Sequence, residues 1–148
     1  MKTEPLVALR EQVSGDEALR SYLVSRFGRP GSHIIGLKKA KKAGDFPYFC
    51  YVVGLEKRDS AFRERRQEVS ILWGINEKEI DHDTNTCLGV LETAEIGELL
   101  VSAILKDCSL GHENAIRVEP SIETATDLGL RHPIYEAEMA LSIRIREQ

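Results

Sequence analysis

Cysteine is scarce in this sequence of 148 residues, and its three cysteines, Cys50, Cys87 and Cys108, lie far apart. Because no pair has the C-x-x-C spacing, the sequence predicts neither a zinc site nor a disulfide framework. No apolar run approaches the ~20 residues that a membrane span needs, and residues 1–5 lack the apolar core of a signal peptide. We therefore expect a soluble protein of a reducing cytoplasm, without a membrane partner.

Catalytic motifs are missing as well. No serine lies in a G-x-S-x-G string, and the glycines form neither G-x-x-x-x-G-K-[ST] nor G-x-G-x-x-G, the two common phosphate-binding patterns. Cys50 lies inside the most apolar stretch, which indicates a buried structural thiol. Cys108 is close to His112 in sequence, but we interpret it as packing at a helix end. The sequence thus predicts no catalytic residue, no cofactor and no enzyme.

The histidines and the tryptophan also point to structural roles. His33, His82, His112 and His132 show neither H-E-x-x-H nor H-x-x-x-H spacing, so they predict no metal site. We expect these histidines at the surface or in turns. Trp73 lies on the apolar side of an alternating segment, which predicts packing in the core.

Acidic residues outnumber basic ones by 24 to 20, which gives a net charge of −4. This balance argues against a dedicated nucleic-acid binder, because such domains are usually basic. The basic residues gather at Lys38, Lys39, Lys41 and Lys42 and again at Arg58, Arg63, Arg65 and Arg66. Acidic residues at 56, 59, 64 and 68 interleave the second group. We interpret both groups as solvated loop charges, with a subunit contact as the alternative.

The length suits one domain spanning residues 1–148, because domains typically contain ~100–150 residues. Its first part reads as two short helices. Pro5 suits a first helical turn, Ser14 and Glu17 have the spacing of a capping box, and Gly28 suits a left-handed helix end. A third, longer helix is predicted over 88–106 from an apolar stripe, whose members are Leu91 or Ala94, Ile96, Leu99, Leu100, Ala103 and Ile104.

Strand patterns occupy the remaining segments. Residues 33–37 form a short candidate, and 47–53 form an almost unbroken apolar run that predicts a strand covered on both faces. Residues 67–75 alternate, residues 55–66 suit the link of a long hairpin, and 76–86 read as a polar loop. Residues 116–122 alternate briefly, and 135–146 alternate most strongly of all. The order predicts an α+β fold with an antiparallel or mixed sheet of about five strands and helices on one face.

One segment is similar to a calcium-binding loop. Over residues 81–92, Asp81, Asp83, Asn85 and Glu92 stand at positions 1, 3, 5 and 12 of such a loop, and a helix follows. However, Thr86 stands where the sharp turn calls for glycine, and the preceding segment reads as a strand. A solvated acidic loop that helps to start the helix is the simpler interpretation, so the sequence predicts no metal site.

The order of elements, taken with a few residues, resembles a known family. A strand led by Pro47 precedes an alternating strand that ends at Trp73. An amphipathic helix over 92–106 follows, then a strand over 118–122 that contains Pro120, and finally the long terminal strand from Tyr135. This arrangement, from about residue 30 to 146, resembles the tail-terminator or tail-completion (minor tail) proteins of long-tailed bacteriophages and prophages.

The resemblance implies a structural role. Such a protein assembles as a ring, a hexamer in this family, that caps the tail tube and offers a docking surface to the head-completion proteins. It would reside in the host bacterial cytoplasm during assembly and then in the tail or neck of the virion. The residues by themselves leave a second hypothesis open, a small cytoplasmic binding module with a calcium-type loop at 81–92.

Overall fold

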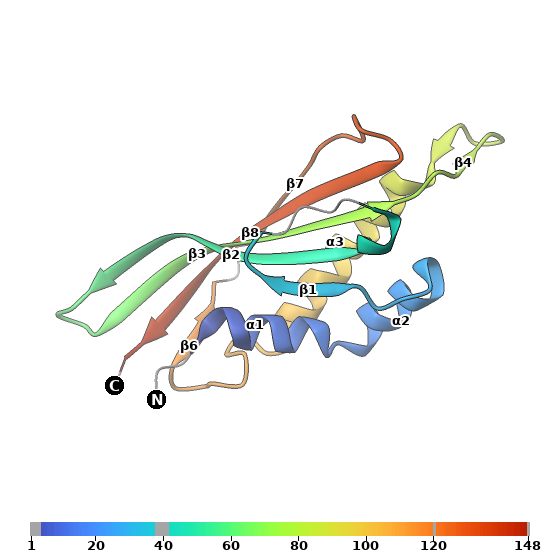
Figure 1. Cartoon of the computed structure of the whole chain (residues 1–148). Coiled ribbons are helices and arrows are strands. Elements are labelled where there is room, and N and C mark those ends of the chain that lie inside the picture. Colours follow the sequence, from blue (N-terminus) through green and yellow to red (C-terminus); the bar gives the residue numbers. More distant parts are fainter. Residues whose placement is uncertain (1–3, 38–41, 120, 148) are drawn as a thin grey trace.

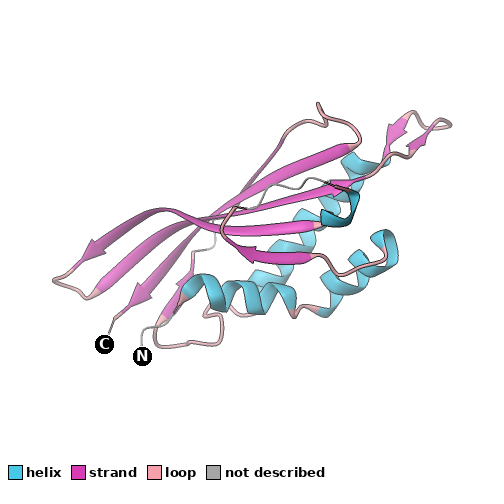
Figure 2. Cartoon of the chain, in the orientation of Figure 1, coloured by secondary structure: helices cyan, strands magenta, loops and turns pink. Residues whose placement is uncertain are grey.

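The computed structural model describes residues 4–37, 42–119 and 121–147, in which three α-helices pack on one side of a mixed six-stranded sheet (Figures 1 and 2). In chain order the elements are α1 (Pro5–Ser14), α2 (Glu17–Phe27), β1 (Ser32–Ile35), the 3₁₀ turn η1 (Ala43–Asp45), β2 (Tyr48–Asp59), β3 (Glu64–Asn76), β4 (Ile80–Asp81), β5 (Thr86–Cys87), α3 (Leu88–Leu105), β6 (Ile116–Val118), β7 (Glu123–Thr126) and β8 (Ile134–Arg146). The sheet order is β1-β2-β3-β8-β6, with β7 also paired to β8. The predicted α+β class is confirmed.

The N-terminal helices form as predicted, with one change of cap. Pro5 stands in the first turn of α1, and Gly28 ends α2 with a φ of 77°. The prediction of a capping box at Ser14 and Glu17 is wrong, because the N-cap is Asp16. Its side chain accepts the hydrogen bond from the Leu19 N–H at 3.0 Å. The side chain of Lys106, just past α3, also contacts the Asp16 carboxylate, which ties α2 to α3.

Strand β8 lies between β3 and the short strands β6 and β7, and it confirms the strongest alternating pattern in the sequence. Its inward side chains are buried against the helices, and they are Tyr135, Ala137, Met139, Leu141, Ile143 and Ile145. β8 pairs antiparallel with β3 along thirteen residue pairs, from Glu64↔Arg146 to Asn76↔Ile134. A strand with partners on both edges and a buried face holds its register firmly, since a slip by one residue would expose the whole apolar set.

The β2–β3 hairpin is longer than the sequence indicates. Residues 55–66, predicted as a polar link, continue both strands, and only residues 60–63 form the turn. β1 runs parallel to β2 but pairs with it only from Tyr48 to Tyr51, which makes the sheet mixed. Beyond this point β2 continues without a second neighbouring strand among the described residues.

Helix α3 buries a stripe that differs from the predicted one at its start. Ile96, Leu100, Ala103 and Ile104 are fully buried, whereas Leu91 is 57% exposed. Gly89 and Thr93 face the sheet instead. A Cβ on Gly89 would lie 2.2 Å from the ring of Tyr135, so only glycine allows the first turn of α3 to approach β8 this closely.

Two segments differ from the predicted strand pattern. The expected loop at 76–86 contains the two-residue strands β4 and β5, which pair with each other. The expected strand at 116–122 ends early, at Val118 in β6, and a further strand, β7, begins only at Glu123. They pair with different parts of β8, and Ile122 lies in neither. These strands are too short for alternation to reveal them.

Candidate functional surfaces

The far half of the β2–β3 hairpin projects from the rest of the molecule, beyond the N-terminal end of α1 (Figure 1). We call residues 53–66 the arm, and we call the part of the sheet that is backed by helices the body. The apolar side chains of the arm are exposed, at 38% for Val53, 51% for Leu55 and 73% for Phe62. Exposed apolar groups on a projecting hairpin indicate a contact surface rather than a reaction site.

Charged groups hold the base of the arm. Arg65 is only 8% exposed, and its Nη1 donates to Glu56 Oε1 at 2.9 Å while its Nε lies 2.7 Å from Glu147 Oε1. Gln67 donates to the same Glu56 oxygen at 3.3 Å. The hydrogen bonds from Arg65 and then Gln67 hold the pKa of Glu56 below its ordinary value. The arm is therefore anchored by an ion-pair network instead of an apolar core.

The basic group predicted as solvated loop charges lies on strands and in a turn. Arg58, Arg65 and Arg66 belong to β2 and β3, and Arg66 and Arg144 each lie 3.3 Å from Glu119 Oε1. A cavity of ≈ 190 Å³ opens among them, lined by Lys57, Arg58, Asp59, Glu64, Arg65, Arg66 and Arg144. The loop interpretation is wrong for these three arginines, although the acidic partners do offset the basic charge. Lys38, Lys39 and Lys41 lie outside the described residues.

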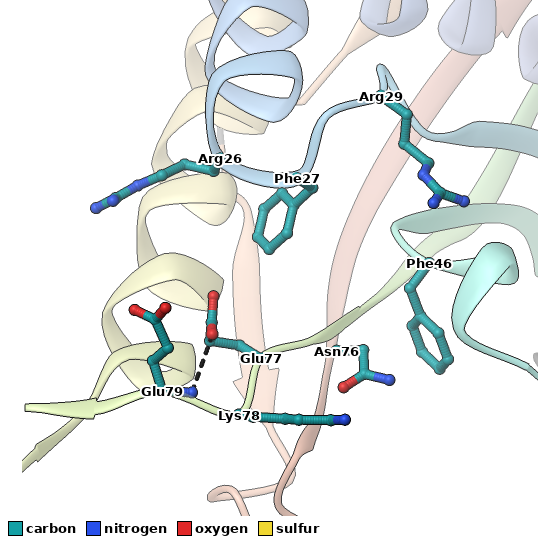
Figure 3. A pocket seen from close by; sticks show the side chains of 8 residues that line it. All are labelled: Arg26, Phe27, Arg29, Phe46, Asn76, Glu77, Lys78 and Glu79. Carbon is teal, nitrogen blue, oxygen red and sulfur yellow. Dashed lines mark hydrogen bonds between the residues drawn. The ribbon is translucent and has the colours of Figure 1, made fainter.

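A second concave surface lies between the C-terminal end of α2 and the segment that follows β3. This groove has a volume of ≈ 440 Å³ and is lined by Arg26, Phe27, Arg29, Phe46, Asn76, Glu77, Lys78 and Glu79. Figure 3 shows the rings of Phe27 and Phe46 on its walls, with residues 76–79 running along the opposite side. The groove thus combines two aromatic rings with charges of both signs.

A buried glutamate, Glu92, lies directly beside this groove. Glu92 in α3 is 4% exposed, and its Oε2 lies 3.9 Å from Arg26 Nε. Burial, together with the neighbouring carboxyl of Glu77, raises the pKa of Glu92 to about 7. The backbone N–H of Glu79 donates to Glu77 Oε1 at 3.0 Å, as the dashed line in Figure 3 marks. Glu92 therefore keeps its proton to a higher pH than an exposed glutamate does.

The calcium-type segment is divided between two environments. Asp81 is the last residue of β4, and its Oδ1 accepts from the backbone N–H groups of Asp83 and Thr84 in the following turn at 3.0 and 3.3 Å. Glu92 is buried in α3 beside Arg26. The structure therefore does not bring the ends of the loop together. Within residues 4–37, 42–119 and 121–147, no group of three His, Cys, Asp or Glu side chains is arranged to hold a metal ion.

Three other predictions concern single side chains. Cys50 is 1% exposed and Trp73 is 1% exposed, so both core predictions are confirmed. His33, expected at the surface or in a turn, is partly buried in the edge strand β1, where its ring stacks on Phe49 at 4.5 Å and shares a 2.8 Å hydrogen bond with the Tyr51 hydroxyl. Burial, followed by the charge of Arg10, lowers the pKa of His33 to about 4. No part of this cluster opens into either cavity described above.

Sequence reasoning missed the most exposed apolar turn of the molecule. Leu128 and Leu130, between β7 and β8, are 81% and 82% exposed. Two leucines around a glycine in a turn are a signal that the sequence does contain. The pairing of Glu77 with Glu92 had no such signal, because the two residues belong to a loop and a helix whose packing decides their distance.

Among the helices in the described part of the chain, none has the length and apolar character required to cross a membrane. No family model matches the sequence, and no curated protein matches it either. Among solved structures the chain is similar to one described as "Virion of native gene transfer agent (GTA) particle", with a TM-score of 0.54 at 10% identity. The match covers 97% of this chain and 95% of that chain. At this identity the likeness concerns the fold, and it extends over nearly the full length of both chains.

Proposed function

We propose that this protein is a structural component of a phage-like particle, and that it acts as a tail terminator. In this role it forms a ring of identical subunits that caps the tail tube and meets the head-completion proteins. The observation that carries the proposal is the full-length fold match to a chain of a gene transfer agent virion. The order of elements in the sequence, which resembles tail-terminator proteins, supports the same conclusion.

The surfaces of the molecule suit this role. A subunit of a ring needs two different contact surfaces, because each copy meets one neighbour with one face and the next neighbour with another. The arm provides exposed apolar side chains and a strand edge with no partner among the described residues. Other virion proteins are therefore its expected partners.

Particle assembly tests this function. The structural genes of the particle are expressed with and without this chain, and the particles are imaged by electron microscopy. Since a cap stops the growth of a tube, its omission should give tubes of uncontrolled length and heads without tails. Immunogold labelling of a tagged chain should mark the end of the tail next to the head. Normal tails joined to heads in the absence of the chain would refute the proposal.

A further inference from the structure

The two short strands β1 and β7 form opposite edges of the body of the sheet, and each contains four residues. In β1, the N–H groups of Ser32 and Gly36 donate to carbonyl oxygens on the β2 side, at 3.1 and 2.9 Å. Because successive residues of a strand direct their backbone groups alternately, His33 and Ile35 direct theirs outward. β1 therefore presents an outer edge to which no other described strand is paired.

The outer edge of β7 also has no paired strand among the described residues. The N–H of Asp127, directly after β7, donates to the Glu136 carbonyl of β8 at 3.1 Å. By the same alternation, Thr124 and Thr126 direct their N–H and C=O groups away from β8. All four residues of β7 are exposed. An exposed, unpaired strand edge is a template for pairing with another chain.

The two edges lie at the same level of the sheet. Following the paired residues across it gives two rows, His33–Phe49–Trp73–Ala137–Thr126 and Ile35–Tyr51–Ile71–Met139–Thr124. The outward residues of both edge strands thus stand in the same rows. Adjacent copies can therefore pair these edges without a shift along the strand direction, and a head-to-tail contact of this kind builds a closed ring when its rotation closes.

The directions of β1 and β7 are also compatible with pairing between copies. β1 is parallel to β2, and the pairs β2·β3, β3·β8 and β8·β7 are all antiparallel, so β7 runs opposite to β1. When a second copy of the same orientation is set beside the first, its β7 meets β1 in an antiparallel arrangement. The sheets of neighbouring subunits then join into one continuous sheet, with the same register at every contact.

A second, independent feature supports this register. In the antiparallel arrangement the start of β1 faces the end of β7, where the exposed Leu128 and Leu130 follow. The start of β1 adjoins the groove lined by Phe27, Arg29 and Phe46. Strand pairing therefore brings the most exposed apolar turn of one copy to the aromatic groove of the next. It also brings Asp127 toward Arg29, which offers its guanidinium to Gly44 O at 2.7 Å and makes no ion pair with a described residue.

We propose that the subunits join by antiparallel pairing of β1 in one copy with β7 in the next, and that Leu128 and Leu130 pack into the groove of that neighbour. The partner of both surfaces is a second copy of this chain. This inference rests on the proposed ring-forming function and names the contact that closes the ring. Ile34 then faces Ala125, and His33 faces Thr126.

Proline substitution tests the edge. In Thr124→Pro the proline removes an N–H that faces outward, so the pairing with β8 and the fold should persist. Thr124→Val keeps that N–H and is the matched control. We expect light scattering to show that association of Thr124→Pro is weaker by at least about tenfold, from the lost hydrogen bond and the bulk of the ring at the contact. Thr124→Val should assemble like the unchanged chain, and both variants should retain its circular dichroism spectrum.

Cross-linking tests the register directly. Ile34→Cys and Ala125→Cys are combined in a chain in which Cys87 and Cys108 are serine. Directly opposed residues of this kind have Cα atoms about 4.5 Å apart in an antiparallel pair, which suits a disulfide. Oxidation should give a ladder of covalent oligomers that ends at the ring size. The control pair Ile34→Cys with Ser102→Cys, on an exposed position of α3, should remain monomeric on a denaturing gel.

The outcomes separate this inference from the proposed function. If the unchanged chain forms rings while Thr124→Pro assembles normally and the cysteine pair gives no ladder, the β1–β7 contact is wrong and the ring function stands. If the unchanged chain remains monomeric at millimolar concentration and on isolated tails, both are overturned. A ladder from the cysteine pair together with weakened assembly of Thr124→Pro supports both.

Discussion

Strands β2 and β3 pass through two parts of the molecule whose surroundings are opposite, the body and the arm. In the body, their inward positions hold Phe49, Tyr51 and Ile71, all fully buried under the helices. Toward the arm, the same face of β3 holds Gln67 and Arg65. Buried positions alternate along β3 from Glu64 to Trp73, but the residue types at these positions change where the cover of helices ends. One sheet thus provides a stable core and a charged, apolar-tipped extension.

This difference indicates that the body stabilises the fold and that the arm serves assembly. Burial of apolar area stabilises the body, at roughly 25 cal/mol per Å² removed from water. The arm buries little apolar area, so its stability depends on pairing to β8 and on the ion pairs of Arg65. Changes in the body should therefore affect folding, and changes at the tip of the arm should affect assembly only.

The largest effect is expected from a deletion in the body. Trp73→Ala removes a fully buried ring against which the helical Gly97 packs, since the Cβ position at Gly97 lies 3.5 Å from that ring. The free energy of unfolding should fall by about 3–5 kcal/mol, as for other large-to-small core changes. Urea unfolding followed by circular dichroism measures it. A loss below about 1 kcal/mol would contradict the view that the body carries the stability.

A smaller effect is expected from the network at the base of the arm. Arg65→Ala leaves the carboxylates of Glu56 and Glu147 without their shared partner, and we expect a loss of about 2 kcal/mol in unfolding free energy. Glu64→Ala, at the adjacent outward-facing position of β3, is the control and should change it little. Equal losses in the two variants would show that the arm's charges do not anchor it.

In the body, Glu92 is a buried acid whose cationic neighbour, Arg26 at 3.9 Å, does not offset the cost of burial. Between its ordinary pKa of 4.5 and about 7, Glu92 binds a proton in the folded protein that it releases in the unfolded chain. Stability should therefore fall as pH rises through this range, and the loss should level off above pH 7. Glu92→Gln should abolish this decrease and raise stability at pH 8 by roughly 1–2 kcal/mol. Melting temperatures from pH 4.5 to 8 measure it, with Glu95→Gln as the control.

The smallest effect on folding is expected at the tip of the arm. Phe62→Ser changes a side chain that is 73% exposed, so the free energy of unfolding should stay within about 0.5 kcal/mol. Assembly onto the tail should nevertheless weaken, because the variant loses an exposed apolar contact. Co-sedimentation with isolated tails measures this, with Ser60→Ala in the same turn as control. Unchanged co-sedimentation would exclude the tip of the arm from the contact.

The sequence by itself determined the elements in which the spacing of neighbouring residues shows which positions are buried or where a helix ends. The alternation of β8, the apolar stripe at the C-terminal half of α3 and the left-handed end of α2 at Gly28 all depend on local spacing, so they could be predicted. Only the tertiary structure decided the rest. The free edges of β1 and β7, the groove and the Glu77–Glu92 pair depend on which distant segments meet, because neither backbone pairing nor burial of a carboxyl is recorded in the spacing of neighbouring residues.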